Sequence, residues 1–220
     1  MDLNPDLSEL TGTLIGDGCL SKFFSRSENR IRKVIAFTGN LDEFDYYSAF
    51  VQPAFQKYFG VTGRLYTRDN NSTRFDVKSV RAFEFFSGLG IPVGKKSHSV
   101  YIPKQIFKNR DLLIPCLRGI WDSDGSIYRR YSKAYSKHSK HYSNLNSMSF
   151  KSCSRRLARE VHRGLEIAGI RPNRVVDCGD SSRFYITRQS EVRKFLELIG
   201  FRNSHHLRRL ERLSLSPIGI

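Results

Sequence analysis

The feature of this sequence that most constrains its fold is an internal repeat. Residues 10–20, LTGTLIGDGCL, have a counterpart in residues 117–127, LRGIWDSDGSI, and in both copies a Leu-x-Gly triplet precedes an Asp-Gly pair. Two further pairs of segments match in the same order: RFDVKS (74–79) with RFYITRQ (183–189), and FEFFSGLGIPVGKKS (83–97) with FLELIGFRNSHHLRRL (195–210). Repeated segments in a fixed order predict two similar structural units. We therefore expect half-domains at 1–97 and 111–220, related by a pseudo-twofold axis and joined by a linker at 98–110.

Hydrophobic periodicity predicts the same order of elements in both halves. In the first half we expect helices over 5–16, 41–58 and 80–89, and strands near 19–26, 31–39, 63–68 and 73–78. In the second half we expect a helix ending at 121, helices near 155–168 and 191–199, and strands near 126–131, 147–152, 175 and 183–187. The order αββαββα, occurring twice, is typical of an α+β fold with antiparallel sheets.

Alternation along the expected strands leaves one face of each sheet polar. At 73–78, Arg74 and Asp76 share one face while Phe75 points to the other. Helices should cover the apolar face, leaving the polar face to solvent or to a partner. The polar set is mostly Arg, Lys, Tyr, Ser and Asn, which suits phosphates and base edges, and a two-stranded ribbon fits the major groove of DNA.

The charge balance supports a polyanionic partner. The chain has 37 Lys+Arg against 21 Asp+Glu, a formal net charge of +16. One small acidic substrate needs few cations, whereas nucleic acid uses many. No apolar run approaches the ~20 residues of a membrane span, so we expect no membrane partner. The candidate DNA-binding residues are Lys22, Arg26, Arg30, Arg32, Asn40, Arg64, Tyr66, Arg68, Arg74, Asp76, Tyr128, Arg130, Lys133, Lys137, Ser149, Lys151, Arg183, Tyr185, Thr187 and Arg188.

Two carboxylates occupy equivalent positions in the repeat. Asp17 and Asp124 each end an expected helix and precede a glycine. That position is unfavourable for an anion, because the C-terminus of a helix is already negative. One Asp-Gly pair is explained by a turn, but two at equivalent places near a dyad axis should lie close together and attract Mg²⁺. The carbonyl oxygens of Gly16 and Ser123 are the natural additional ligands.

The residues around these acids resemble a known family. Residues 10–18 (LTGTLIGDG) and 117–125 (LRGIWDSDG) are similar to the nine-residue motif of the LAGLIDADG homing endonucleases, in their single-chain, two-motif form. The segments LLIPCLRGIWDSDGSIY and LGIPVGKKS also resemble the family, so the similarity covers nearly the whole chain. The first motif has Ile15 where the sixth-position Asp usually stands. The family's catalytic acid, at the eighth position, is present in both copies as Asp17 and Asp124.

The resemblance implies a specific architecture and activity. We expect two saddle-shaped antiparallel sheets with helices on their convex side, and motif helices packed together through Gly12 and Gly119. The implied activity is site-specific, Mg²⁺-dependent cleavage of double-stranded DNA across the minor groove, leaving short 3′ overhangs. Mn²⁺ should replace Mg²⁺, and Ca²⁺ should bind without supporting cleavage.

The resemblance also implies polar residues near the metals. Lys78 matches the family's strand-end lysine and is assigned to the catalytic set, with Thr187 or Arg188 as its counterpart in the second half. Asn40 matches a polar metal- or water-contacting position, with Cys153 or Ser154 opposite. A cysteine there would make the two half-sites chemically unequal.

The implied partner is a long double-stranded DNA site bound by a monomer. An RNA maturase acting on the chain's own intron, and a non-catalytic DNA-binding regulator, are the alternatives on the same fold; retention of both acids favours cleavage. The start at Met and the end LSPIGI favour a free-standing protein over one embedded in an intein. The four cysteines lack CxxC spacing, which predicts neither a zinc site nor a disulfide framework. With no secretory signal either, we expect an intracellular protein of a prokaryotic cytoplasm or nucleoid, or of an organelle.

Overall fold

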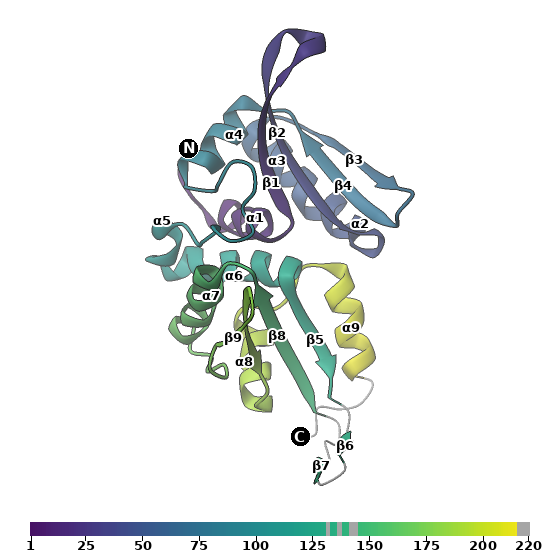
Figure 1. Cartoon of the computed structure of the whole chain (residues 1–220), viewed down its shortest axis with the longest axis vertical. Coiled ribbons are helices and arrows are strands. Elements are labelled where there is room, and N and C mark those ends of the chain that lie inside the picture. Colours follow the sequence, from purple (N-terminus) through teal and green to yellow (C-terminus); the bar gives the residue numbers. More distant parts are fainter. Residues whose placement is uncertain (131–132, 136–137, 141–144, 215–220) are drawn as a thin grey trace.

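The computed structural model describes residues 1–130, 133–135, 138–140 and 145–214. Its two halves stack along the long axis of the molecule, and helices α1 (Pro5–Gly16) and α6 (Arg110–Asp124) lie between them (Figure 1). The predicted duplication is confirmed, because the two halves contain four-stranded antiparallel sheets with corresponding strand orders, β1-β2-β4-β3 and β5-β8-β10-β9.

The first half follows the predicted order of elements. After α1 come β1 (Gly18–Ser25) and β2 (Arg30–Asn40), joined through a short 3₁₀ turn, η1 (Arg26–Glu28). The expected helix at 41–58 is composite: a 3₁₀ turn, η2 (Leu41–Glu43), then α2 (Phe44–Tyr46), a π-helical turn, η3 (Tyr47–Val51), and α3 (Gln52–Phe59). Strands β3 (Arg64–Arg68) and β4 (Ser72–Val77) and helix α4 (Val80–Gly88) complete the half.

The second half adds elements to this pattern. Its sheet consists of β5 (Gly125–Arg129), β8 (Asn146–Ser152), β9 (Val176–Cys178) and β10 (Ser181–Ile186), with helices α7 (Arg155–Ile167) and α8 (Gln189–Leu198). The basic segment between β5 and β8 contains a short pair, β6 (Lys133–Tyr135) and β7 (His138–Lys140). Two helices were not predicted: α5 (Lys104–Phe107), inside the expected linker, and α9 (Ser204–Ser214), in what reads as a basic tail.

The start of α1 is encoded locally. Asn4 Oδ1 accepts a hydrogen bond from the Leu7 amide at 3.0 Å, and Pro5 occupies the first helical turn. Both features are typical of helix N-termini, because they satisfy or remove amides that have no partner inside the helix. Asn109 caps α6 in the same way, because its side-chain oxygen accepts a hydrogen bond from the Asp111 amide.

Helices α1 and α6 are in backbone contact. A Cβ on Gly12 would lie 2.1 Å from the Cys116 carbonyl oxygen, and a Cβ on Gly119 would lie 2.1 Å from the Glu9 carbonyl oxygen. Any larger residue at either position would therefore separate the helices. This close approach brings the C-terminal ends of both helices together.

Each half buries an aromatic core between one face of its sheet and its own helices. In the first half, Phe55 contacts Phe37, Phe75 and Phe86 at ring-centroid distances of 5.9, 5.5 and 6.1 Å. In the second half Trp121 is fully buried, as expected for a packing residue. The opposite face of each sheet is left open. In the described part of the chain, no helix has the length and apolarity needed to cross a bilayer.

Candidate active site

The two acids meet at the contact between α1 and α6. Asp17 follows the last residue of α1, and Asp124 is the last residue of α6. The β position of Gly16 lies 2.3 Å from Ser123 Cβ and 3.5 Å from Asp124 Cγ. The structure therefore brings together the two carboxylates that the repeat singled out.

Asp17 lies in an enclosed, negatively charged environment. Burial of its carboxyl group, followed by the charges of Glu43 and Asp124, raises the pKa of Asp17 well above its usual value. Two groups oppose this shift: Tyr47 Oη donates a hydrogen bond to Asp17 Oδ2 at 3.1 Å, and Lys96 supplies a positive charge. A nearby cation would therefore stabilise the ionised form of Asp17.

Asp124 is more open. The residue is exposed, although protein atoms around its carboxyl group raise the pKa, and Lys96 lowers it. Among the described residues, none donates a hydrogen bond to the Asp124 side chain. The two acids of the pair are therefore supported differently.

Lys96 is the cation that the fold places beside both acids. Its Nζ donates hydrogen bonds to the carbonyl oxygens of Leu14 (3.0 Å) and Gly16 (2.8 Å), and also to that of Ile15. These are C-terminal carbonyls of α1, whose last turn contains no basic residue, so Lys96 supplies the positive charge and the donors that a helix end favours. Burial lowers the pKa of Lys96, and the charges of Asp124 and Asp17 partly restore it.

The lysine predicted for this place, Lys78, lies elsewhere. It follows Val77, which pairs with Ile35 on β2. The backbone amide of Thr38, also on β2, donates a hydrogen bond to the Asp17 carbonyl at 3.2 Å. Thr38 lies three positions from Ile35, so Val77 and Asp17 lie at levels of the sheet that are about 10 Å apart along the strands. By position between strand end and helix cap, the counterpart of Lys78 is Thr187, since β10 ends at Ile186 and residue 188 caps α8.

The other predicted polar positions divide into structural caps and cleft residues. Asn40 caps η2, and its amide donates to Glu43 Oε2 at 2.6 Å. Ser154 caps α7 through a bond from the Leu157 amide at 3.2 Å. Cys153, in contrast, lines the cleft at the acids.

A cleft opens at the junction of the halves. It contains Asp124 together with basic and polar side chains from both halves, and its floor is formed by the end of α1. The polar lining residues are Cys19, Lys95, Lys96, Ser97, Asp124, Lys151, Ser152 and Cys153. Three lysines beside Asp124 suit a phosphodiester better than a neutral ligand.

Comparisons with known proteins agree with this architecture. Residues 111–200 match the model of the LAGLIDADG-like domain. The structure of I-DmoI in complex with DNA and Ca superposes with a TM-score of 0.65 at 16% identity, covering 94% of this chain and 97% of that one. The LAGLIDADG meganuclease I-AabMI bound to uncleaved DNA gives a TM-score of 0.62 at 12% identity, covering 97% and 90%.

Residues 111–200 thus resemble a LAGLIDADG-like domain, and the chain as a whole has the fold of the LAGLIDADG meganucleases. A sequence relative is the replication factor C small subunit of Methanocaldococcus jannaschii, 28% identical in an alignment of 219 residues that covers 95% of this chain. This chain spans only 10% of the length of that protein.

The paired acids suit a hard divalent cation. Mg²⁺ is commonly held by one or two protein carboxylates, with phosphate and water oxygens completing its octahedron. Asp17 and Asp124 provide such a pair, and their repulsion is relieved by a cation between them. In the described part of the chain, no three His, Cys, Asp or Glu side chains form a self-sufficient metal site. Ligation by the Gly16 and Ser123 carbonyls stays a prediction, and the Gly16 oxygen already accepts a bond from Lys96.

The open face of the first sheet carries one group of the predicted DNA-contacting side chains. Strand pairing places Arg64, Tyr66, Arg68, Arg74 and Asp76 on one face. The Arg64 and Arg68 guanidiniums lie 4.9 and 5.9 Å from the Tyr66 ring, while Asp76 forms an ion pair with Arg74 at 2.8 Å and accepts a bond from Tyr66. Asp76 therefore orders its basic neighbours.

The hairpin of β1 and β2 requires one correction. Lys22 pairs with Lys33 and lies on the face of buried Leu20, where its charge acts on Glu84 of α4. It therefore points away from the polar face, because side chains alternate along a strand. Arg30 and Arg32 occupy the polar face but form ion pairs with Glu28 of η1, and Arg26 is exposed in that turn.

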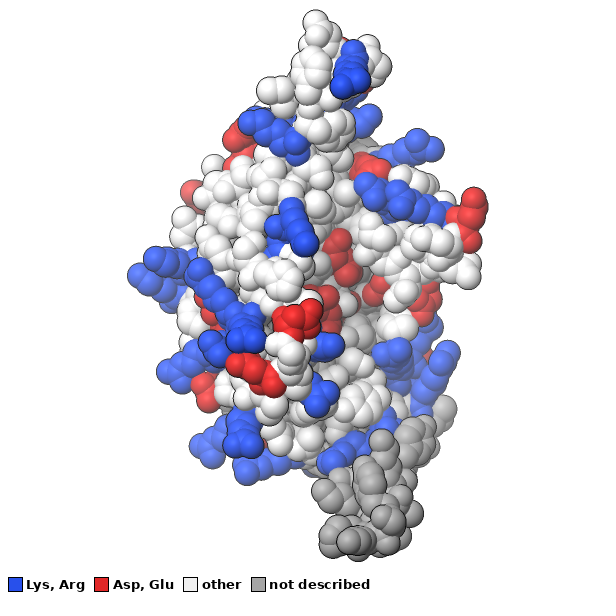
Figure 2. Space-filling view, viewed as in Figure 1, with Lys and Arg blue, Asp and Glu red and all other residues white. Residues whose placement is uncertain are grey.

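The second sheet repeats the polar face with different residues. Register places Tyr128, Ser149, Lys151, Arg183 and Tyr185 together on one side. Figure 2 shows Lys and Arg over both halves of the molecule, with acidic side chains gathered near its middle.

The remaining predicted contacts lie at the margins of this sheet. The Arg130 amide bonds the Leu145 carbonyl, Thr187 Oγ1 donates to Asn173, and Arg188 precedes α8 as an exposed residue. Lys133 belongs to β6, and Lys137 lies outside the described residues.

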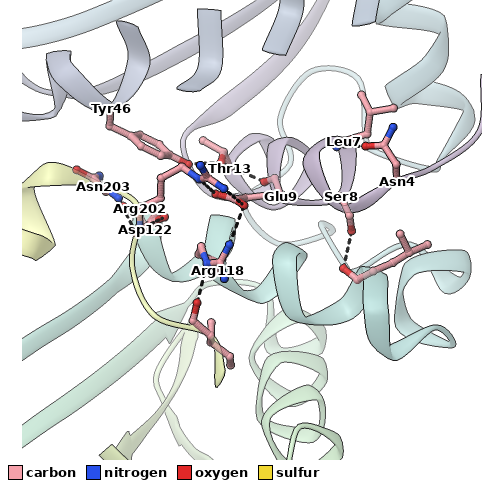
Figure 3. Close-up of polar contacts among 12 residues, drawn as sticks. Asn4, Leu7, Ser8, Glu9, Thr13, Tyr46, Arg118, Asp122, Arg202 and Asn203 are labelled. Atoms are coloured by element: carbon pink, nitrogen blue, oxygen red, sulfur yellow. Dashed lines mark hydrogen bonds and ion pairs between the residues drawn. The ribbon is translucent and has the colours of Figure 1, made fainter. Parts of the chain in front are cut away.

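A polar network joins the halves beside the acids (Figure 3). The carboxylate of Asp122, the sixth residue of the second motif, accepts hydrogen bonds from the amides of Arg202 and Asn203 at 3.1 to 3.2 Å. Asn203 Nδ2 then donates to Glu43 Oε1 at 2.8 Å across the junction. Arg202 also pairs with buried Glu9 of α1. The segment after α8 thus ties the second half to the residues that surround Asp17.

The segments that follow α4 and α8 therefore both dock near the motif helices, but through different groups. The first places Lys96 at the C-terminal carbonyls of α1, and the second places Asn203 at the carboxylate of Asp122. Sequence reasoning missed both residues, although their segments were recognised as a repeated pair. The signal for Lys96 was a helix end without its own basic residue.

Proposed function

We propose that this protein is a site-specific DNA endonuclease that uses a divalent cation to hydrolyse one phosphodiester bond in each strand. We assign the cuts to opposite sides of the minor groove, with short 3′ overhangs. The observation that carries this proposal is the meeting of two carboxylates, one from each half, beside a lysine and between two polar sheet faces.

In this proposal Asp17 and Asp124 hold divalent cations, and each acid serves the cut of one strand. When bound, such a cation supplies positive charge that favours deprotonation of water and stabilises the oxygen that leaves the phosphorus. Solved relatives support a hard divalent ion, since I-DmoI complexes with DNA contain Mn or Ca, and one variant was studied with Mg. We assign Mg²⁺ as the working ion, with Mn²⁺ as a substitute and Ca²⁺ as a non-productive ligand.

The chain's own groups do the remaining work. Lys96 places an ammonium next to both acids, where it attracts the scissile phosphate and offsets charge that builds up on it. The polar sheet faces position the duplex through phosphate and base contacts, and deformation of the DNA contributes to the choice of site. One chain provides both half-sites, so we propose a monomer on a long asymmetric duplex.

The decisive experiment finds the target and tests the chemistry together. A plasmid library is incubated with the protein and Mg²⁺, linear molecules are recovered, and their ends are sequenced. We expect one recurrent site with short 3′ overhangs. Asp17→Asn and Asp124→Asn should each abolish double-strand cutting while keeping binding to that site in Ca²⁺. Double-strand cutting by either variant would contradict the assigned roles, and binding without cutting by the unaltered protein would indicate the regulator.

A further inference from the structure

The two acids differ in one contact that the repeat does not explain. Tyr47 Oη donates to Asp17 Oδ2 at 3.1 Å, whereas the Asp124 side chain receives no hydrogen bond from the described residues. Tyr47 is fully buried, so its hydroxyl needs an acceptor inside the protein. Asp17 is that acceptor.

The Tyr47 hydroxyl is held in a rigid setting. Tyr47 begins the π-helical turn η3, an arrangement frequent at functional sites. Its ring packs edge-on against Phe37 and Tyr46 at 6.3 and 5.9 Å between centroids. On the other side, a Cβ on Gly39 would lie 2.9 Å from Tyr47 Oη. The glycine therefore leaves space for the hydroxyl, and the packed ring holds that hydroxyl beside Asp17.

The second half has no tyrosine at the corresponding place. Counting from the helix caps, Tyr47 lies seven residues after Asn40, and the residue seven after Ser154 is Val161. Val161 is buried and apolar. The difference between the acids therefore follows from the amino-acid sequence.

We propose that Tyr47 is a positioning residue for Asp17: its hydroxyl fixes one carboxylate oxygen and leaves the other for the cation, so that only the DNA strand served by Asp17 depends on it. This inference rests on the proposed function and on its assignment of one strand to each acid. Outer contacts that orient a metal ligand are typically worth 10–100-fold in metal affinity or rate. The two strand cuts should consequently respond differently to loss of this one oxygen atom.

The test compares Tyr47→Phe with Tyr46→Phe. Both remove one hydroxyl from a buried tyrosine and keep the ring, but the Tyr46 hydroxyl bonds Thr13 Oγ1 at 2.7 Å and touches neither acid. Each strand of the target is labelled separately, and nicking of each is followed in Mg²⁺. We expect Tyr47→Phe to slow one strand by on the order of tenfold or more, to leave the other unchanged, and to accumulate nicked intermediate. Tyr46→Phe should slow neither strand.

A second measurement does not depend on cleavage. Calorimetric titration with Ca²⁺, on the protein bound to duplex DNA, should show affinity reduced by on the order of tenfold for Tyr47→Phe and unchanged for Tyr46→Phe. Thermal unfolding of both variants shows whether any change in Ca²⁺ affinity comes with a general loss of stability. Equal slowing of both strands together with unchanged Ca²⁺ affinity would overturn the positioning role. Absence of cutting by the unaltered protein would instead refute the proposed function, and the Ca²⁺ titration would still decide the role of Tyr47.

Discussion

Replacing Gly12 with alanine tests whether backbone contact between α1 and α6 sets the position of the acids. The added Cβ would lie 2.1 Å from the Cys116 carbonyl oxygen and 3.0 Å from the Ile120 nitrogen. Both are backbone atoms, so no side-chain rotation relieves the overlap. Reaching an ordinary contact distance requires the helices to separate by about 1 Å. Overpacking of this kind costs up to about 3 kcal/mol, which for a chain of this size lowers Tm by roughly 6–12 °C.

The same displacement should be visible in catalysis. A shift of about 1 Å between reacting groups can cost on the order of a hundredfold in rate. The cleavage rate of Gly12→Ala should therefore fall much further than the fraction of folded protein does. Circular dichroism melting gives the stability, and cleavage is measured well below Tm. Gly88→Ala is the matched control, since its Cβ meets nothing within 4 Å and alanine is favoured in helices. A Gly12→Ala protein that melts and cuts like the unaltered one would refute the reasoning.

The remaining predictions concern other parts of the molecule. Lys96→Met should slow cleavage by ~10²–10³-fold with little change in DNA binding in Ca²⁺; equal activity would exclude an electrostatic role. Asn203→Ala leaves buried partners unsatisfied and should cost about 1–3 kcal/mol in urea unfolding; an unchanged midpoint would argue against the network between the halves. Burial lowers the pKa of His206 to about 4 from 6.5. As the pH falls, this histidine is therefore protonated in the unfolded chain before it is protonated in the folded protein. Stability should therefore fall by about 2 kcal/mol between pH 8 and 5, and His206→Phe should remove that part of the pH dependence. Arg64→Gln should reduce the slope of log K against log salt for DNA binding by about 0.9, whereas Lys22→Gln, on the opposite face, should leave it unchanged.

The fold was predictable because each half repeats a complete pattern. Strand alternation, helix caps and the order of elements are local properties, and the second copy checks the first. The meeting of Asp17 and Asp124 could be predicted for the same reason. Equivalent residues near a dyad axis must lie near each other.

The residues that were missed depend on contacts distant in sequence. Lys96 reaches the end of α1 across about eighty residues, and no local pattern distinguishes it from Lys95 or Lys78. The role of Asp122 likewise appears only when the segment after α8 docks on it.

Two other errors left signals in the sequence. Alternation from the apolar Leu20 places Lys22 on the inner side of the hairpin, so its orientation could have been inferred. Helix α9 spaces Leu207, Leu210 and Leu213 three residues apart, a helical pattern hidden within a basic segment. In both cases the position of a residue in the pattern is more informative than its charge.

The contact between Asn203 and Glu43 has a consequence for any attempt to build a homodimer from one half of this chain. Two copies of the first half would place Ile15 where Asp122 now receives the incoming amides. Two copies of the second half would offer Leu157, three residues after its cap, where Glu43 stands in the first half. A homodimer of either half would therefore lack this junction, which needs one set of residues from each half.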